Sequence, residues 1–288
     1  MMPPKISFEF FPPQNLEGSF RLWDTINTLA PLQPRFVSVT YGAGGTTRDL
    51  THEAVRTINR ATGLNTAAHL TCVAASRAET LEIAENYAAA GITEIVALRG
   101  DPPKGEGRFA PHPEGFANSV ELIEALARPG KFTLRVGAYP DTHPEARSTV
   151  DDINWLKAKL DAGADEAITQ FFFEAESFLR FRDACAKAGI DKPVIPGILP
   201  IENWKGARNF ATRCGTSIPA WLDDAFAKAQ RDDREDLLAT ALCTELCSDL
   251  IDEGVDSLHF YTLNRPELTR DVCHALGVTP KVALQNVA

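Results

Sequence analysis

The chain has 288 residues, of which 44% are hydrophobic and 24% are charged, and it contains 19 Gly and 19 Pro. These are the proportions of a folded globular protein, so extended disorder and a fibrous repeat are excluded. Its 29 basic and 39 acidic side chains give a net charge of −10, which argues against nucleic acid or an anionic membrane as the main partner. No apolar run approaches about 18 residues, so no membrane-spanning helix is expected.

Cysteine spacing and the N-terminal residues indicate the compartment. The 6 Cys include no C-x-x-C pair, and Cys243 and Cys247 stand at i and i+4 of a helical pattern, as small core residues do. Such spacing in a chain of this length does not predict a disulfide framework. The first residues, Met-Met-Pro-Pro-Lys, lead directly into a strand-like run without the apolar segment of a signal peptide. We therefore expect a cytoplasmic protein.

Strand-like and helix-like segments alternate along the whole chain. The predicted strands are Lys5–Phe10, Arg35–Tyr41, Thr66–Cys72, Glu94–Leu98, Phe132–Ala138, Glu166–Phe171, Pro193–Ile195 and Ser257–Tyr261. The predicted helices include Phe20–Leu29, Leu50–Ala61, Glu79–Ala90, Val120–Ala127, Val150–Asp161, Phe178–Ala188 and Arg265–Leu276, with a longer helical stretch over Pro219–Glu253. Glycines that follow helical runs and precede strands predict the helix ends, at Gly63, Gly91, Gly163 and Gly189.

This alternation predicts parallel strands joined by right-handed crossovers. An open doubly wound α/β sheet would use the same alternation. Eight such units in 288 residues, without a break in composition or a Ser/Gly-rich linker, favour a closed (β/α)8 TIM barrel. We therefore expect an α/β protein in which residues 1–288 form one barrel, a single catalytic domain.

The active sites of such barrels lie at the C-terminal ends of the strands, so polar residues there are the candidates. Glu9 ends the first strand among aromatic residues, and burial there is expected to raise its pKa; a Glu that faces solvent is the alternative. Arg99, Gly100 and Asp101 follow the fourth strand and suit an anionic, hydrogen-bonding ligand. The alternative is that Arg99 and Asp101 pair with each other and cap the loop.

Three further strand ends carry polar residues. Gln170 stands beside three Phe, which suits a flat heterocycle, although a buried structural amide is the alternative. Arg265 follows the last strand and is either a ligand contact or a solvated rim residue. His69 stands alone in the third strand, with no second His or carboxylate at ligand spacing, and His259 also lacks a recognisable partner. No metal site is therefore expected.

Two known motif classes are excluded. The Gly-rich run 42–47 is not the dinucleotide fingerprint G-x-G-x-x-G, because its third glycine position holds Thr47 and no acidic residue ends the strand that follows. It is more consistent with a loop that brings backbone amides near a ligand. No Lys lies at a strand C-terminal end, which weighs against a Schiff-base aldolase. These residues alone predict an enzyme or a binder for a planar, anionic heterocycle.

Ten short runs form an ordered set from the first strand to the last. They are Ser7–Pro13, Val37–Gly42, His69–Cys72, Ala97–Asp101, Ala138–Pro140, His143–Ala146, Asp161–Ala164, Ile168–Phe173, Pro196–Pro200 and His259–Arg265. Together they resemble the methylenetetrahydrofolate reductase family, in its bacterial form with the catalytic barrel only. The resemblance implies an FAD-dependent enzyme that takes hydride from NADH or NADPH and reduces 5,10-methylenetetrahydrofolate to 5-methyltetrahydrofolate by ping-pong transfer. It also implies a homo-oligomer.

The resemblance assigns roles to the residues at the strand ends. Glu9 would be the general acid that helps to open the imidazolidine ring of the folate and form its 5-iminium cation, a task that a raised pKa suits. Asp101 would stay ionised, stabilise this cation and contact both flavin and pterin. Gln170 would bind the pterin and Arg265 the glutamate tail, and Phe210 would be a further substrate contact.

The resemblance also implies a set of cofactor contacts. They are Thr40, Tyr41, His69, Arg99, Gly100, Asp101, Phe116, Ala117, Tyr139, His143, Asp152 and Lys159. Within this set Arg99, His143 and Lys159 would provide positive hydrogen-bonding groups near a diphosphate. Trp155 and Ala158 depart from the pattern, since better-known members carry Asn and Arg there. Two alternative functions are a proline dehydrogenase-like flavin barrel and a non-catalytic flavin- or folate-binding barrel.

Overall fold

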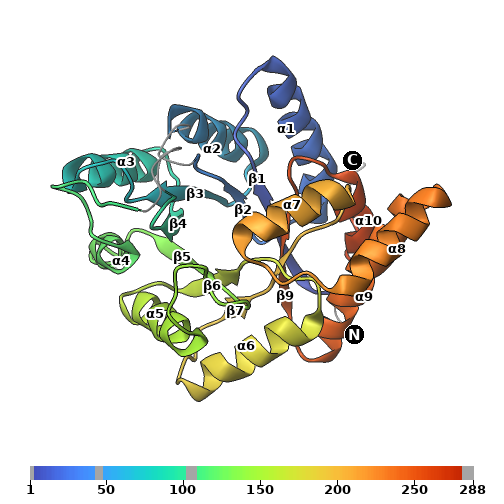
Figure 1. Cartoon of the computed structure of the whole chain (residues 1–288). Helices are drawn as coiled ribbons and strands as arrows, with labels where there is room; N and C mark the ends of the chain where they lie inside the picture. The colour runs from blue at the N-terminus through green and yellow to red at the C-terminus, as the bar shows by residue number, and fades with distance from the viewer. Residues whose placement is uncertain (1–2, 43–47, 102–108, 281–288) are drawn as a thin grey trace.

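A parallel β-sheet curls into a barrel at the centre of the molecule, and helices surround it (Figure 1). The structure is a computed structural model that describes residues 3–42, 48–101 and 109–280. Its strands are β1 (Lys5–Phe10), β2 (Val37–Val39), β3 (Thr66–Thr71), β4 (Glu94–Leu98), β5 (Thr133–Ala138), β6 (Glu166–Thr169), β7 (Val194–Ile195), β8 (Gly197–Ile198) and β9 (Ser257–Tyr261). The strands pair in chain order, the first strand β1 pairs with the last strand β9, and the two ends of the sheet, β7 and β8, are consecutive in the chain, so the barrel prediction is confirmed over the open sheet.

The sheet closes through one strand that Pro196 divides into β7 and β8. β7 pairs with β6, whereas β8 pairs with β9. Proline has no N–H to donate to a ladder, but the Pro196 carbonyl accepts the backbone N–H of His259 at 3.0 Å. Gly197 follows, and a Cβ there would lie 2.1 Å from the carbonyl oxygen of Thr169. The predicted strand Pro193–Ile195 is thus only the first half of the seventh barrel strand.

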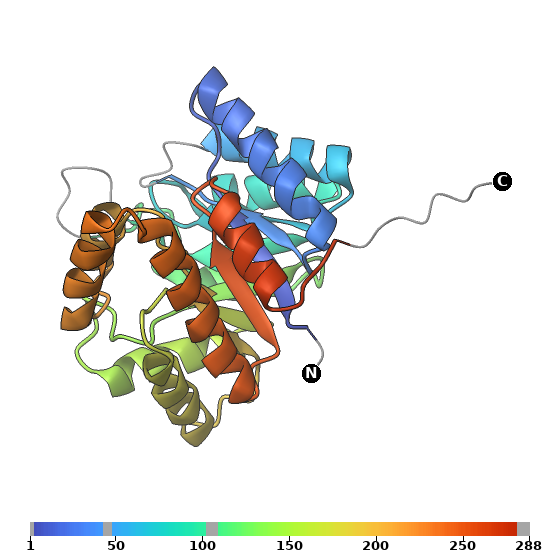
Figure 2. The same ribbon diagram turned by 90° about the vertical axis from the view of Figure 1, so that its right-hand side faces the viewer.

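The helices pack around the outside of the sheet, as the view in Figure 2 also shows. They are α1 (Leu16–Leu29), α2 (Arg48–Thr62), α3 (Arg77–Ala89), α4 (Ser119–Ala127), α5 (Thr149–Asp161), α6 (Ala175–Lys187), α7 (Trp204–Cys214), α8 (Ala220–Arg231), α9 (Glu235–Asp252) and α10 (Glu267–Ala275). A short 3-10 helix, Ala30–Leu32, follows α1. None of these helices is long and apolar enough to cross a membrane within the described part of the chain.

Local backbone chemistry sets the helix ends. The four glycines predicted to end helices all have positive φ, with values of 67, 79, 122 and 76°. The long predicted stretch Pro219–Glu253 is two helices, because the chain turns at Asp233, whose φ is 52°. Apolar spacing in the sequence does not predict α7, which Asn203 caps by accepting the backbone N–H of Gly206 at 2.8 Å.

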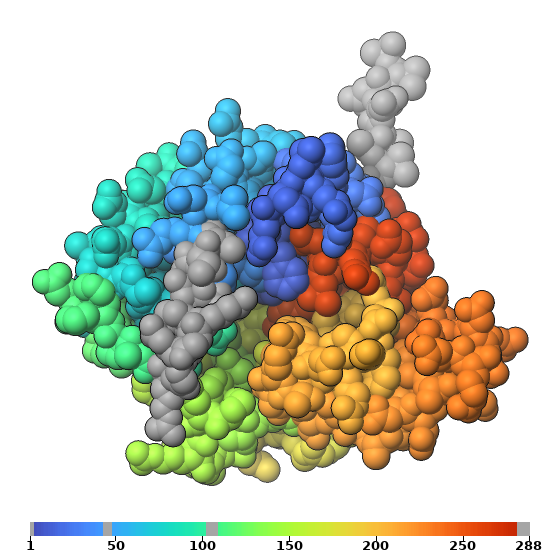
Figure 3. Space-filling view, turned by 45° about the horizontal axis from the view of Figure 1, so that its top comes forward, coloured from blue at the N-terminus to red at the C-terminus, as the bar shows by residue number. Residues whose placement is uncertain are grey.

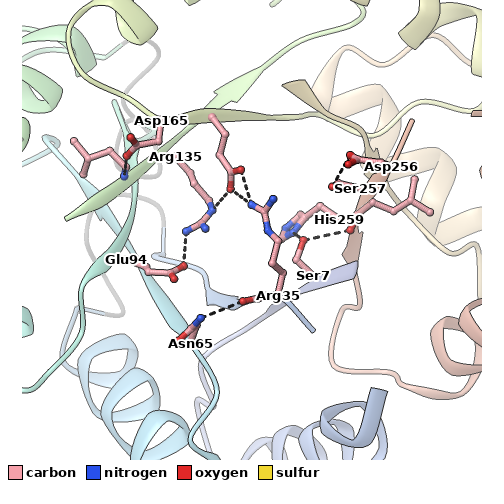
Figure 4. A network of polar contacts seen from close by, with 12 residues as sticks. Ser7, Arg35, Asn65, Glu94, Arg135, Asp165, Asp256, Ser257 and His259 are labelled. Atoms are coloured by element: carbon pink, nitrogen blue, oxygen red, sulfur yellow. Dashed lines mark hydrogen bonds and ion pairs between the residues drawn. The ribbon is translucent and has the colours of Figure 1, made fainter. Parts of the chain in front are cut away.

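A buried ion network lies at the N-terminal ends of the strands, away from the predicted site. Arg135 on β5 is 4% exposed; it donates to Glu94 of β4 at 2.6 Å and also to Glu166 of β6. Arg35 donates to the same Glu166. Figure 4 shows Arg35, Arg135 and Glu94 converging in this network. The Arg135 guanidinium also lies over the ring of Phe36, 3.6 Å from its centre. Every buried charge here therefore has a partner of opposite sign.

Candidate active site

Two adjoining cavities open at the carboxyl ends of the strands. The inner cavity, of about 200 Å³, lies over the barrel axis, and the outer cavity, of about 400 Å³, extends toward α5. Leu98, Gly137 and Tyr139 line both, so the two cavities meet beside β4 and β5. Phe11, after β1, and Phe210, on α7, line the inner cavity. In Figure 3 the beginning of the chain (blue) and α7 (yellow-orange) lie on the same face of the molecule.

Glu9 lines the inner cavity and lies between two histidines. Its Oε2 is 3.3 Å from Nε2 of His69 on β3 and 3.8 Å from Nε2 of His259 on β9. The parallel register sets Ser7 opposite His259 and Glu9 opposite Tyr261, so alternate residues of β1 and β9 face the barrel interior together. The sequence analysis did not predict that His259 lies beside Glu9. The alternation of inward-facing residues in these two strands is the pattern that indicates it.

Ser7 orients the imidazole of His259. The Ser7 hydroxyl lies 2.8 Å from Nδ1 and 3.3 Å from the carbonyl oxygen of Leu258, to which it donates. With the hydroxyl donating to the carbonyl of Leu258, Nδ1–H donates to the Ser7 oxygen, and Nε2 carries a hydrogen toward Glu9 only when the ring takes up a second proton. Among the described residues, Nε2 of His69 and of His259 makes no other hydrogen bond. A proton held between Glu9 and one of these rings would therefore give both the carboxylate oxygen and the Nε2 atom a hydrogen-bond partner.

The expectation that burial leaves Glu9 with a raised pKa is wrong. Burial does raise the pKa, but hydrogen bonding and charge interactions with His259 and His69 outweigh it and bring the pKa of Glu9 to about 2. Burial lowers the pKa of His259, which is fully buried. Glu9 is thus a carboxylate at neutral pH. Any proton that it passes on has to be shared between its carboxylate and the imidazoles of the neighbouring histidines.

The lowered pKa links Glu9 to acid stability. From its ordinary 4.5, the pKa falls to about 2 in the folded protein, so ionised Glu9 contributes stability that is complete above about pH 4.5 and is lost as the pH falls toward 2. We predict that the free energy of unfolding, measured with urea, decreases more between about pH 5 and pH 3 in the wild type than in Glu9→Gln. Equal decreases in the wild type and in Glu9→Gln would show that the folded protein does not favour the ionised form of Glu9 over the protonated form.

Gln170 and Phe210 line the same inner cavity, as predicted for a substrate wall. The Gln170 Oε1 accepts the backbone N–H of Phe171 at 3.0 Å, which fixes the orientation of the amide. Phe210, on α7, stacks on Phe171 with ring centres 5.2 Å apart and planes at 28°. The structure therefore brings a carboxylate, an oriented amide and an aromatic ring together around one small cavity, which suits a flat, polar heterocycle.

The outer cavity collects the predicted cationic groups. Arg99 forms an ion pair with Glu145, so within the described chain its partner is not Asp101, the pairing considered as an alternative. Lys159 is 8% exposed and donates to the carbonyl of Gly137, at the junction of the two cavities. Burial lowers the pKa of Lys159 to about 8. A buried ammonium of this kind favours an anionic ligand.

Backbone constraints shape the walls of the outer cavity. Gly100 has a φ of +87°, and a Cβ there would lie 2.9 Å from the Cβ of Thr71, so only glycine fits. The backbone N–H of His143 donates to Asp152 at 2.8 Å, and its ring meets Tyr139 edge-on at 4.6 Å. All five of these residues line the outer cavity, and all but Thr71 match predicted cofactor positions. Tyr41 and the exposed Asp101 line the cavity too.

Four predicted site residues do not line either cavity in the described structure. Thr40 lies just past β2 beside Tyr41, and its N–H donates to the backbone. Phe116 is 1% exposed in the core, and Ala117 is exposed just before α4. Arg265 lies on the rim, where it pairs with Glu202 at 3.2 Å. Residues 43–47 of the Gly-rich loop, a predicted source of backbone amides, lie outside the described residues.

The fold is that of a (β/α)8-barrel protein with two adjoining cavities at the carboxyl ends of its strands. The family model for methylenetetrahydrofolate reductase matches residues 3–277. The chain therefore belongs to the methylenetetrahydrofolate reductase family, which confirms the resemblance seen in its motifs. Members of this family are generally FAD-dependent enzymes.

Individual relatives agree with this membership. The chain is 46% identical over 279 residues to the 5,10-methylenetetrahydrofolate reductase of Pectobacterium carotovorum subsp. carotovorum, covering 96% of this chain and 92% of that protein. It is 47% identical over 276 residues to that of Escherichia coli (strain K12), covering 96% and 91%. A solved structure from Clostridium thermocellum, described as binding two copies of 5-methyl-5,6,7,8-tetrahydrofolic acid, shares the fold with a TM-score of 0.62 at 13% identity, covering 96% of this chain and 95% of that one.

Proposed function

We propose that this chain, as one catalytic domain over residues 1–288, reduces 5,10-methylenetetrahydrofolate to 5-methyltetrahydrofolate with electrons from NADH or NADPH and with FAD as cofactor. Close relatives that carry this activity in their names match nearly the whole chain. The observation that carries the proposal is the convergence of Glu9, His69 and Gln170 on the inner cavity, with His259 buried behind Glu9 and with a larger adjoining cavity whose lining includes Arg99 and Lys159.

The outer cavity fits FAD. Arg99 and the buried Lys159 offer charge to a diphosphate, and an anion beside Lys159 would counter the burial that lowers its pKa. Gly100 presents backbone without a Cβ to the same cavity. These local cations act against the overall charge of −10, which by itself repels an anionic cofactor. FAD, when bound, supplies the two-electron transfer between the reduced nicotinamide and the folate.

The inner cavity supplies the proton chemistry. The proton is held between Oε2 of Glu9 and the Nε2 atoms that face it, and it passes to the imidazolidine nitrogen of the folate that leaves when the ring opens. The carbon–nitrogen bond breaks with its electron pair on that nitrogen, and a 5-iminium cation remains. Gln170 orients the pterin, and Phe210 covers it. Asp101, at the end of β4, provides the negative charge that stabilises the cation.

Neutralising Asp101 should slow only the reaction with folate. We expect Asp101→Asn to weaken folate binding and to slow folate reduction by about 10²-fold, because a preorganised charge that stabilises the cation is lost. Oxidation of NADH or NADPH should change little, and stopped-flow spectroscopy follows each half-reaction. Asp224→Asn, on the exposed part of α8, removes the same charge elsewhere and should change neither rate. An unchanged folate rate in Asp101→Asn would remove Asp101 from the mechanism.

Product analysis tests the proposed reaction. The purified protein, supplied with FAD, NADH or NADPH and 5,10-methylenetetrahydrofolate, should form one 5-methyltetrahydrofolate for each nicotinamide oxidised, as measured by liquid chromatography. Initial rates at varied concentrations of both substrates should give the parallel double-reciprocal lines of a ping-pong reaction. Reduction of the flavin by proline, without any folate product, would instead favour the proline dehydrogenase-like alternative.

A further inference from the structure

Trp155 is an exposed aromatic side chain on the wall of a polar cavity. It lies on α5 and lines the outer cavity with 43% of its surface exposed. Asp152, Trp155 and Lys159 stand at i, i+3 and i+7 of this helix, so they share the face that borders the cavity. A large indole left open inside a cavity, beside charged groups, provides a flat apolar surface that a planar ligand can cover.

The position of Trp155 along the cavity indicates which part of a bound ligand the indole would contact. Lys159 donates to Gly137, which lines both cavities, so Lys159 marks their junction. Trp155 precedes Lys159 by four residues, about 6 Å along the helix axis, and lies only in the lining of the outer cavity. Passing outward from Glu9, a ligand would therefore meet the junction, then the cationic groups, and then the indole.

We propose that Trp155 is the platform on which the adenine ring of FAD stacks. The inference rests on the proposed function, which places the folate in the inner cavity and FAD in the outer cavity, with its diphosphate beside Arg99 and Lys159, so that the flavin ring meets the folate at the junction. The adenine is then left for the outer end of the cavity. Ala158, on the same helix, has only a methyl side chain. In this chain the adenine is thus held by stacking on an indole.

A comparison of FAD with FMN isolates the adenine, because FMN lacks the adenylyl half. Stacking of a base on an aromatic side chain corresponds to roughly 10-fold in affinity. We expect Trp155→Ala to weaken FAD binding to the apoprotein about 10-fold, as measured by calorimetry, and to leave FMN binding unchanged. Trp155→Phe should keep most of the FAD affinity. Trp221→Ala is the matched control, because Trp221 is 45% exposed on α8 and lines a different cavity.

A second probe needs no flavin. ADP should quench part of the tryptophan emission of the apoprotein, and this quenching should disappear in Trp155→Ala but persist in Trp221→Ala. Three results would overturn the proposal: equal losses for FAD and FMN, an unchanged FAD affinity, or quenching by ADP that survives in Trp155→Ala. If the wild type binds neither flavin, the proposed function itself fails and the adenine site with it, and this result is distinct from the other three.

Discussion

Glu9→Gln is expected to abolish folate reduction while NADH or NADPH still reduces the flavin at nearly the wild-type rate. The glutamine amide keeps the size of the side chain but cannot hold a transferable proton beside His69 and His259. Loss of a general acid costs about 10²- to 10⁴-fold, so the folate half-reaction should fall by that factor. Anaerobic stopped-flow spectroscopy of the flavin measures the two half-reactions separately.

Two comparisons make this result specific to the chemistry of Glu9. Glu17→Gln, on the exposed part of α1, removes one carboxylate that lines neither cavity and should leave both half-reactions unchanged. The melting temperature of Glu9→Gln, measured with FAD bound, reports whether the barrel still folds. If both half-reactions fall by the same factor in a folded variant, Glu9 supports flavin binding or the fold and is not the acid.

Arg135→Met is expected to have the largest effect on stability. The substitution leaves the carboxylates of Glu94 and Glu166 with Arg35 as the remaining cation of the network, and Arg35 pairs with Glu166. Removal of one partner from a buried ion network costs about 3–5 kcal/mol, because the remaining charge stays away from water. The free energy of unfolding in urea measures this loss, and partial or complete unfolding at growth temperature is the extreme form of the same result.

An exposed ion pair is the control for Arg135. Lys131 and Glu85 lie 2.7 Å apart with side chains 47% and 57% exposed, and Lys131→Met should cost less than about 1 kcal/mol. The triple variant that also replaces Glu94 and Glu166 with Gln should recover much of the stability that Arg135→Met loses, since both carboxylates that Arg135 neutralised are then uncharged and Arg35 is partly exposed to water. A loss in Arg135→Met no larger than that in Lys131→Met would show that water reaches the network.

Much of the architecture could be predicted because each element carries a local signal. Apolar spacing and terminal glycines locate the helices, and these signals depend only on neighbouring residues. The seventh strand was predicted too short because Pro196 interrupts it, and the continuation in β8 is held by pairing with β9, some sixty residues later in the chain. Helix α7 was not predicted, because its apolar face is short and its start depends on the cap at Asn203.

The site shows the same division between local and long-range information. Strand ends point to Glu9 and Gln170 directly, because position in the barrel decides that they reach the mouth. The pKa of Glu9 could not be predicted in this way, since it depends on His69 and His259, which only the closed barrel brings within 3.3 and 3.8 Å. Burial alone predicts the opposite direction, and the histidines reverse it.

One anaerobic spectrum tests the central claim most directly. The purified protein, reconstituted with FAD, should lose its flavin absorbance near 450 nm on addition of NADH or NADPH, as reduced flavins generally do. Addition of 5,10-methylenetetrahydrofolate should then restore the absorbance, whereas proline should neither bleach the oxidised flavin nor restore the reduced one. Flavin that stays reduced in the presence of 5,10-methylenetetrahydrofolate would contradict the account.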